Sequence, residues 1–63
     1  MENRYSLQVL KYDGTSDYKE IEADTYQIQE GVIKFLSDGG NTWITIAVYP
    51  SDKTIISKIQ KLK

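Results

Sequence analysis

The amino-acid sequence predicts an all-β domain in which five short strands follow one another as an antiparallel meander. Three observations support this prediction. Apolar and polar side chains alternate along most of the chain, which is the two-residue period of a half-buried strand. Residues typical of turns separate these stretches at short intervals. The length of 63 residues allows one domain, residues 1–63, with a small core.

The first two predicted strands differ in regularity. Tyr5–Tyr12 begins with strict alternation, and a turn is expected after it at Asp13–Asp17 because Asp-Gly favours tight turns. The strand that starts at Tyr18 changes phase: its apolar positions are odd-numbered up to residue 23 and even-numbered from residue 26. A bulge or kink at Asp24–Thr25 would explain this change and would let one long strand serve two sides of a small barrel.

The middle of the chain contains the clearest turns. A tight hairpin is expected at Glu30–Gly31, because Gly accepts the positive φ that such turns require. A short strand at Val32–Leu36 follows, and Ser37–Asn41, with two adjacent glycines, is the strongest turn signal. The next strand, Thr42–Tyr49, has no charge on either face. We therefore expect it to be the central strand, covered on both sides by protein or by a partner chain.

The C-terminal segment has two interpretations. Pro50 ends the preceding strand because it has no N–H for the ladder. The isoleucines of residues 53–62 fit one stripe of a helix with Asp52 as its N-cap, whereas the β-branched run Thr54–Ile56 favours a strand. We favour the strand. Together these elements predict a small SH3-like or OB-like barrel or half-barrel.

The composition excludes most of the common catalytic chemistries. The chain contains no Cys and no His, so it can form no disulfide, no zinc site of thiolates or imidazoles, and no Ser-His-Asp triad. We expect a protein that is not an enzyme and that holds no cofactor or metal. Small domains usually need a disulfide, a metal or self-association for stability, and a homodimer is therefore expected here.

Charge is distributed unevenly, although the net charge is only −1. Residues 13–30 include six acids and one lysine, whereas residues 53–63 include four lysines and no acid. Glu20, Glu22 and Asp24 occupy alternate positions, so on a regular strand their carboxylates project from one face. Such a row is either a solvated face or a contact for a basic patch on another protein.

Aromatic side chains are the second group of candidate contacts. Five Tyr, one Trp and one Phe are present, and such residues are frequent both in strands and in interfaces. Trp43, with Tyr49 expected on the same strand face, is the preferred interface hot spot. The candidate protein-binding residues are therefore Trp43, Tyr49, Tyr26, Glu20, Glu22 and Asp24.

Two other functions are compatible with the same residues. In a nucleic-acid-binding barrel, tyrosines would stack on bases while Lys53, Lys58 and Lys61 contact phosphates, although the net charge provides no general attraction. The glycine pair at residues 39–40 lacks the spacing of a phosphate-binding loop. A third possibility is a structural role in which the oligomer contact is itself the function.

The last two thirds of the chain contain the pattern Ala23-Asp24-x-Tyr26-x-Ile28-x-x-Gly31-Val32-x-x-Phe35, followed by Ile46–Pro50 and an Ile-x-x-x-Ile near the end. In this pattern the chain resembles small bacteriophage or prophage all-β proteins of the host-inhibitor, anti-defence type. These are strand and hairpin positions, so the resemblance transfers no functional residue. It implies a protein that binds and blocks a host protein.

The sequence also bears on localisation. No apolar run approaches the roughly 18 residues of a membrane span, and residues 1–4 do not resemble the start of a signal peptide. We therefore expect a cytoplasmic protein, in the host cytoplasm if a phage encodes it. The predicted function is that of a non-enzymatic, homodimeric binding protein that blocks a host protein.

Overall fold

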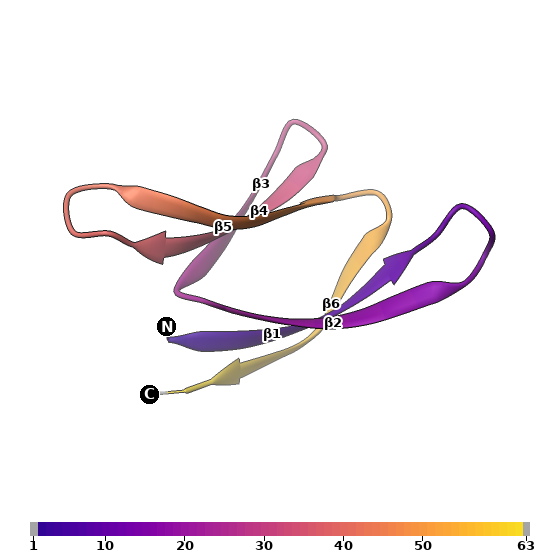
Figure 1. Cartoon of the computed structure of the whole chain (residues 1–63), viewed down its shortest axis with the longest axis horizontal. Helices are drawn as coiled ribbons and strands as arrows, with labels where there is room; N and C mark the ends of the chain where they lie inside the picture. The colour runs from indigo at the N-terminus through magenta and orange to yellow at the C-terminus, as the bar shows by residue number, and fades with distance from the viewer. Residues whose placement is uncertain (1, 63) are drawn as a thin grey trace.

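Six β-strands form most of residues 2–62, the part of the chain that the computed structural model describes (Figure 1). This part is all-β, as predicted, and it contains no helix. The strands are, in order, β1 (Asn3–Leu10), β2 (Ser16–Ala23), β3 (Thr25–Gln29), β4 (Val32–Asp38), β5 (Trp43–Pro50) and β6 (Thr54–Lys61). The last of them confirms the strand, and not the helix, for the C-terminal segment.

The strands make two antiparallel sheets, in the orders β2-β1-β6 and β3-β4-β5. The predicted count of five strands is wrong, because the long second strand is divided at Asp24 between the two sheets. The predicted barrel is also wrong. Each sheet ends at its own edge strands within residues 2–62, and no closed barrel forms. The break at residue 24 was nevertheless correctly placed by the change of phase in the sequence.

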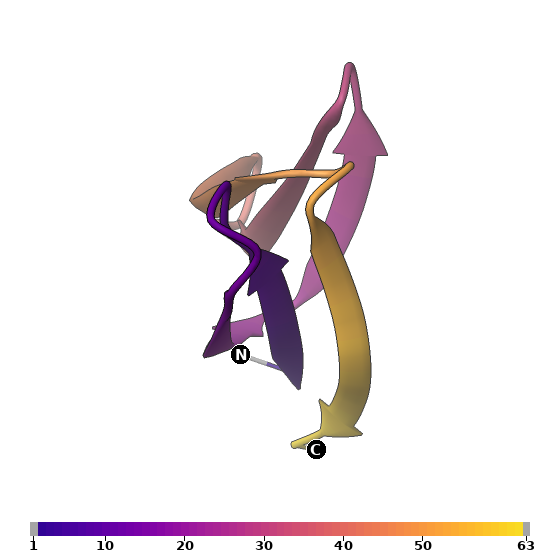
Figure 2. The ribbon, with the colours of Figure 1, turned by 90° about the vertical axis from the view of Figure 1, so that its right-hand side faces the viewer.

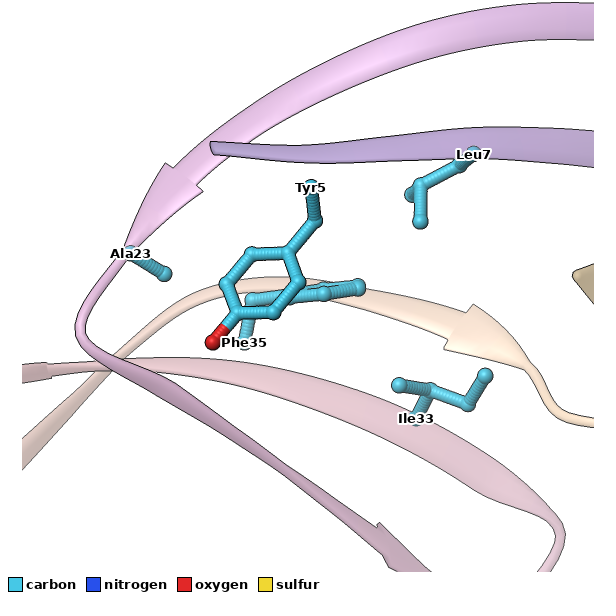
Figure 3. Close-up of a cluster of buried hydrophobic side chains, with 5 residues drawn as sticks. All are labelled: Tyr5, Leu7, Ala23, Ile33 and Phe35. Atoms are coloured by element: carbon cyan, nitrogen blue, oxygen red, sulfur yellow. The ribbon is translucent and has the colours of Figure 1, made fainter. Parts of the chain in front are cut away.

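The two central strands carry most of the core that lies between the sheets (Figure 3). Tyr5 and Leu7 point from β1 toward Ile33 and Phe35 of β4, and Ala23 lies beside them at the end of β2. The ring centroids of Tyr5 and Phe35 are 5.2 Å apart. A fully buried side chain of this size contributes roughly 1.5–3 kcal/mol to the stability of the fold. The packing of this small cluster therefore holds the two sheets together.

Backbone conformation explains the tight connection between β3 and β4. Glu30 and Gly31 have φ angles of 52° and 79°, as a two-residue type I′ turn requires, so the predicted hairpin is confirmed. The first turn lies slightly earlier than predicted. β1 ends at Leu10, and the Lys11 N–H donates to the Thr15 carbonyl over 2.7 Å, which closes the turn before β2 begins at Ser16.

The ends of the described chain lie side by side, next to the β1–β6 ladder (Figures 1 and 2). The Leu62 N–H donates to the Glu2 carbonyl over 2.7 Å. The β1–β2 and β4–β5 turns occupy opposite ends of the long axis in Figure 1.

Within residues 2–62 β5 is an edge strand, so the prediction that it is the central strand is wrong for the single chain, whereas coverage by a partner chain stays a prediction. It pairs with β4 on one side, and the β3-β4-β5 sheet ends there within residues 2–62. Only Ala47 and Tyr49 of this strand pack against the core. The absence of charge suggested burial on both faces, but a strand in a domain this small finds one layer of protein to pack against, not two.

Candidate protein-binding surface

The largest concentration of exposed apolar side chains along one strand lies on β5. Four of its side chains are exposed: Trp43 by 55%, Ile44 by 54%, Ile46 by 40% and Val48 by 50% of their maximum. We call these four residues the β5 strip. Scattered apolar residues are normal on protein surfaces, but a run of them along one free edge strand is not. The strip is therefore the strongest candidate for a binding surface among residues 2–62.

A bulge distributes the side chains of β5 between two faces. Tyr49 is paired with Ile33 and Ala47 with Phe35, so these residues face the core. The register then shifts between Phe35 and Leu36, because one extra residue of β5 is inserted. Beyond the shift Trp43 is paired with Asp38, whose position on β4 alternates to the outer face.

The predicted placement of Trp43 and Tyr49 on the same face is therefore wrong. Simple counting by twos from 43 to 49 ignores the inserted residue, and the bulge places the two rings on opposite faces. Trp43 lies on the outer face with Val48, which is paired with Lys34. This outer face has apolar residues on β5 and the charged residues Lys34 and Asp38 beside them on β4.

The β4–β5 turn fixes the start of the strip. The Gly39 N–H donates to the Thr42 carbonyl over 2.9 Å, and the Gly40 N–H donates to the Asp38 carboxylate over 2.8 Å. Ile44 closes over the turn: a Cβ added at Gly39 would lie 2.7 Å from the Ile44 Cδ1 atom. Glycine at this position therefore allows Ile44 to lie against the turn immediately after Trp43.

Tyr26 and Tyr49 both make ring contacts with aromatic residues of the core. The Tyr49 ring centroid lies 6.1 Å from that of Phe35, and Tyr26 lies 5.5 Å from Tyr5 in an edge-to-face arrangement. Such aromatic pairs contribute about 0.5–1.5 kcal/mol beyond the area they bury. Tyr49 packs against the core on the face opposite Trp43, and Tyr26 is 37% exposed on β3, so binding by these two tyrosines stays a prediction.

The predicted acidic row is divided into two parts. Glu20 and Glu22 are exposed on β2 and share its outer face, where Glu22 lies 3.5 Å from the Arg4 guanidinium. Asp24 lies outside the strand, in the link between the sheets. Because β2 ends before Asp24, its carboxylate does not continue the row formed by the two glutamates.

The Asp24 carboxylate joins three parts of the chain. The Asp38 and Glu2 N–H groups donate to it over 2.7 and 2.9 Å, and the Ser37 hydroxyl donates over 3.2 Å. The Asp38 N–H bond, together with the Glu2 and Ser37 bonds, holds the pKa of Asp24 below its usual value, although partial desolvation acts in the opposite direction. Asp24 is therefore occupied in stabilising the junction.

The three candidate lysines do not share a surface. Lys53 lies in the turn before β6, and Lys58 is paired with Ser6 whereas Lys61 is paired with Asn3. Ser6 and Asn3 stand at positions of opposite parity on β1, so the two strand lysines project from opposite faces. Lys58 and Lys61 therefore do not form one continuous basic surface.

The sequence did not identify Ile44, Ile46 and Val48 as surface residues. The chain has no charged residue between Asp38 and Asp52. Such an uncharged stretch is compatible both with a buried strand and with an exposed apolar surface. Only the position of β5 at the edge of its sheet distinguishes the two. An edge leaves the strand's backbone and its outer side chains open to another chain.

Comparisons with known proteins add no family. No protein-family model, no curated protein and no solved structure matches the chain. Residues 2–62 include no group of three or more Asp or Glu side chains arranged to hold a metal ion. The same residues form no helix of the length and apolarity needed to cross a membrane.

Proposed function

We propose that this chain is a non-enzymatic binding protein that acts by covering a surface of another protein, as an inhibitor of a host protein does. The observation that carries the proposal is the β5 strip, an exposed row of apolar side chains that includes Trp43. Burying such side chains against a partner is favourable by about 25 cal/mol for each Å² removed from water. The chain gains nothing comparable from them while they are in solvent.

The outer face of the β4–β5 pair has the composition of a contact surface. Interfaces have an apolar centre, often containing Trp, and a polar rim that excludes water. Here Trp43 and Val48 are apolar, and the residues paired with them on β4 are Asp38 and Lys34. The two charges are of opposite sign, so they favour one orientation of a partner with the complementary arrangement.

Inhibition by coverage requires no catalytic group in this chain. Its resemblance to small phage proteins, stated from the strand pattern, supports a host protein as the target. Glu20 and Glu22 lie on the outer face of the other sheet, so a contact through them is separate from the β5 strip. Trp43 is thus the residue on which the proposal depends.

The test is affinity capture from a bacterial lysate with immobilised protein, followed by binding of the purified captured protein. Wild type is compared with Trp43→Ala and with the matched control Tyr12→Ala, which removes an aromatic ring that is 97% exposed in the β1–β2 turn. We expect one protein to bind wild type and the control, with at least tenfold weaker binding to Trp43→Ala. Equal binding by all three would contradict the proposed surface.

The same experiment distinguishes the nucleic-acid alternative. One arm is treated with nuclease, and binding is measured at two salt concentrations. A protein contact through the β5 strip is unaffected by nuclease and loses little affinity in salt. Recovery of nucleic acid, with affinity that falls steeply as salt is added, would instead support contacts from Lys53, Lys58 and Lys61 to phosphates.

A further inference from the structure

The four sheet edges of the fold are protected to different degrees. A free edge strand presents unpaired N–H and C=O groups, and proteins limit pairing there with charges, short strands, bulges or proline. β2 carries four charged residues, β6 carries Lys58 and Lys61 together with a bulge, and β3 has only five residues. These three edges are poor templates for another strand.

β5 lacks most of this protection. It has eight residues and no charge, and its β-branched and aromatic side chains favour pairing. Its bulge lies against β4, and Pro50 stands only at its last position. The free edge from Trp43 to Tyr49 can therefore accept a strand along most of its length.

We propose that the strand added to this edge is β5 of a second copy of the same chain. A two-fold axis perpendicular to the sheet makes such pairing antiparallel and places each copy's β5 against the other's. The lack of charge is what makes the strand self-complementary: pairing brings no like charges opposite each other at any antiparallel register. The product is a continuous six-stranded sheet, β3-β4-β5-β5-β4-β3.

This pairing deepens the proposed function and rests on it for its biological meaning. Edge pairing uses the backbone of β5 and leaves the outer face of the sheet open. Because the two-fold axis is perpendicular to the sheet, the outer faces of both copies lie on the same side of it. Trp43 and Val48 of one copy therefore share a face with Val48 and Trp43 of the other, in reversed order along the antiparallel strands. The dimer thus offers its target a doubled apolar surface, with the Asp38 and Lys34 of both copies at its margins.

The oligomeric state of edge variants tests the inference. Thr45 is exposed in the middle of β5, and Thr45→Lys places one positive charge from each copy close to the two-fold axis. The matched control is Gln27→Lys, an exposed position on the β3 edge. By sedimentation equilibrium at tens of micromolar, we expect wild type and the control to have twice the mass of the chain and Thr45→Lys to dissociate at least tenfold more readily.

A second measurement does not depend on the tolerance of β5 for lysine. Because the chain has no Cys, a single introduced thiol can form a disulfide only with another copy. Under mild oxidation, Thr45→Cys should form disulfide-linked dimers much faster than Gln27→Cys. Equal rates, or a wild type that sediments as a monomer, would overturn the inference.

Failure of the dimer and failure of the proposed function give different results. If wild type is a monomer and still captures its target through Trp43, the proposed dimer is contradicted and the proposed function is not. If dimerisation depends on Thr45 but the target binds Trp43→Ala as tightly as wild type, the dimer is supported and the proposed binding surface is contradicted. Trp43→Ala is expected to remain dimeric, since it alters the outer face and not the backbone edge.

Discussion

The two sheets of this fold share one core but differ on their outer faces. The β2-β1-β6 sheet presents Glu20, Glu22, Arg4 and Lys58 to solvent, with Arg4 and Glu22 within 3.5 Å of each other. On the outer face of the β3-β4-β5 sheet, Trp43 and Val48 of the β5 strip lie beside Asp38 and Lys34. The two sheets therefore differ in the side chains that they present to a partner. The outer face of the first sheet has charged residues on all three of its strands, although Tyr18 and Ile55 are exposed there as well, whereas four exposed apolar side chains of the second sheet lie along β5.

The largest expected effect tests the shared core. Phe35→Ala removes the ring that contacts Tyr5, Tyr26 and Tyr49, which costs about 3–5 kcal/mol. A domain of this length has roughly 3–9 kcal/mol of stability in total. We expect the variant to be largely unfolded by circular dichroism, with loss of cooperative urea unfolding.

Leu7→Ala is the matched change in the other sheet. It should weaken both sheets together, by about 2–5 kcal/mol, because the two sheets unfold as one unit. If either variant melted one sheet and left the other with native amide protection, the single shared core would be contradicted.

The next effect concerns the β3–β4 turn. Gly31 has a φ of 79°, where an added Cβ is strained although no atom lies within 4 Å of it. Gly31→Ala should destabilise the chain by about 1–2 kcal/mol, measured by urea unfolding. Gly31→Asn should lose less, because Asn tolerates this region. Equal losses for Ala and Asn would show that conformational strain is not the cause.

A smaller effect is expected at the junction between the sheets. The pKa of Asp24 is lowered, first by the Asp38 N–H and then by the Glu2 and Ser37 donors, from an ordinary 3.8. Stability from this carboxylate is therefore fully present above pH 3.8 and is lost as the pH falls through the lower folded pKa. Asp24→Asn should lower the urea midpoint at neutral pH and reduce the loss of stability in acid.

Glu20→Gln is the control for this change, because Glu20 is exposed on β2 and accepts no hydrogen bond comparable to those at Asp24 in the described residues. Its urea midpoint at neutral pH should remain that of wild type. A similar acid profile for wild type and Asp24→Asn would remove Asp24 as a contributor to the pH dependence.

Trp43→Ala is expected to have the smallest effect on stability of these variants and the largest effect on target binding. Trp43→Ala alters a side chain that is 55% exposed, and its monomer stability should change by no more than about 0.5 kcal/mol. Urea unfolding at low protein concentration measures this change. A loss comparable to that of Phe35→Ala would mean that Trp43 belongs to the core, and the contrast between the sheets would fail.

Local chemistry predicted a large part of this fold. The alternation of residues 5–9, the Glu30–Gly31 turn and the β-branched start of the last strand all act through near neighbours, so the sequence identified each of them. The kink at Asp24 was also visible, because a change in the parity of apolar positions requires a local break in a strand.

The errors concern relations that span the chain. The order of strands places β5 at an edge, and no local pattern distinguishes an uncharged edge strand from a central one. The β5 bulge separates Trp43 from Tyr49, and it depends on the pairing with β4. Asp24 was grouped with Glu20 and Glu22 by spacing alone, whereas its partners are distant in sequence, at Glu2 and Asp38.

Hydrogen exchange of the backbone amides, measured at low and high protein concentration, tests most directly whether β5 is the strand through which this protein contacts another chain. We expect protection to increase with concentration at residues 43–49, while residues 25–29 of the β3 edge exchange at an unchanged rate. Increased protection at the β2, β3 or β6 edges with none at β5 would contradict this expectation.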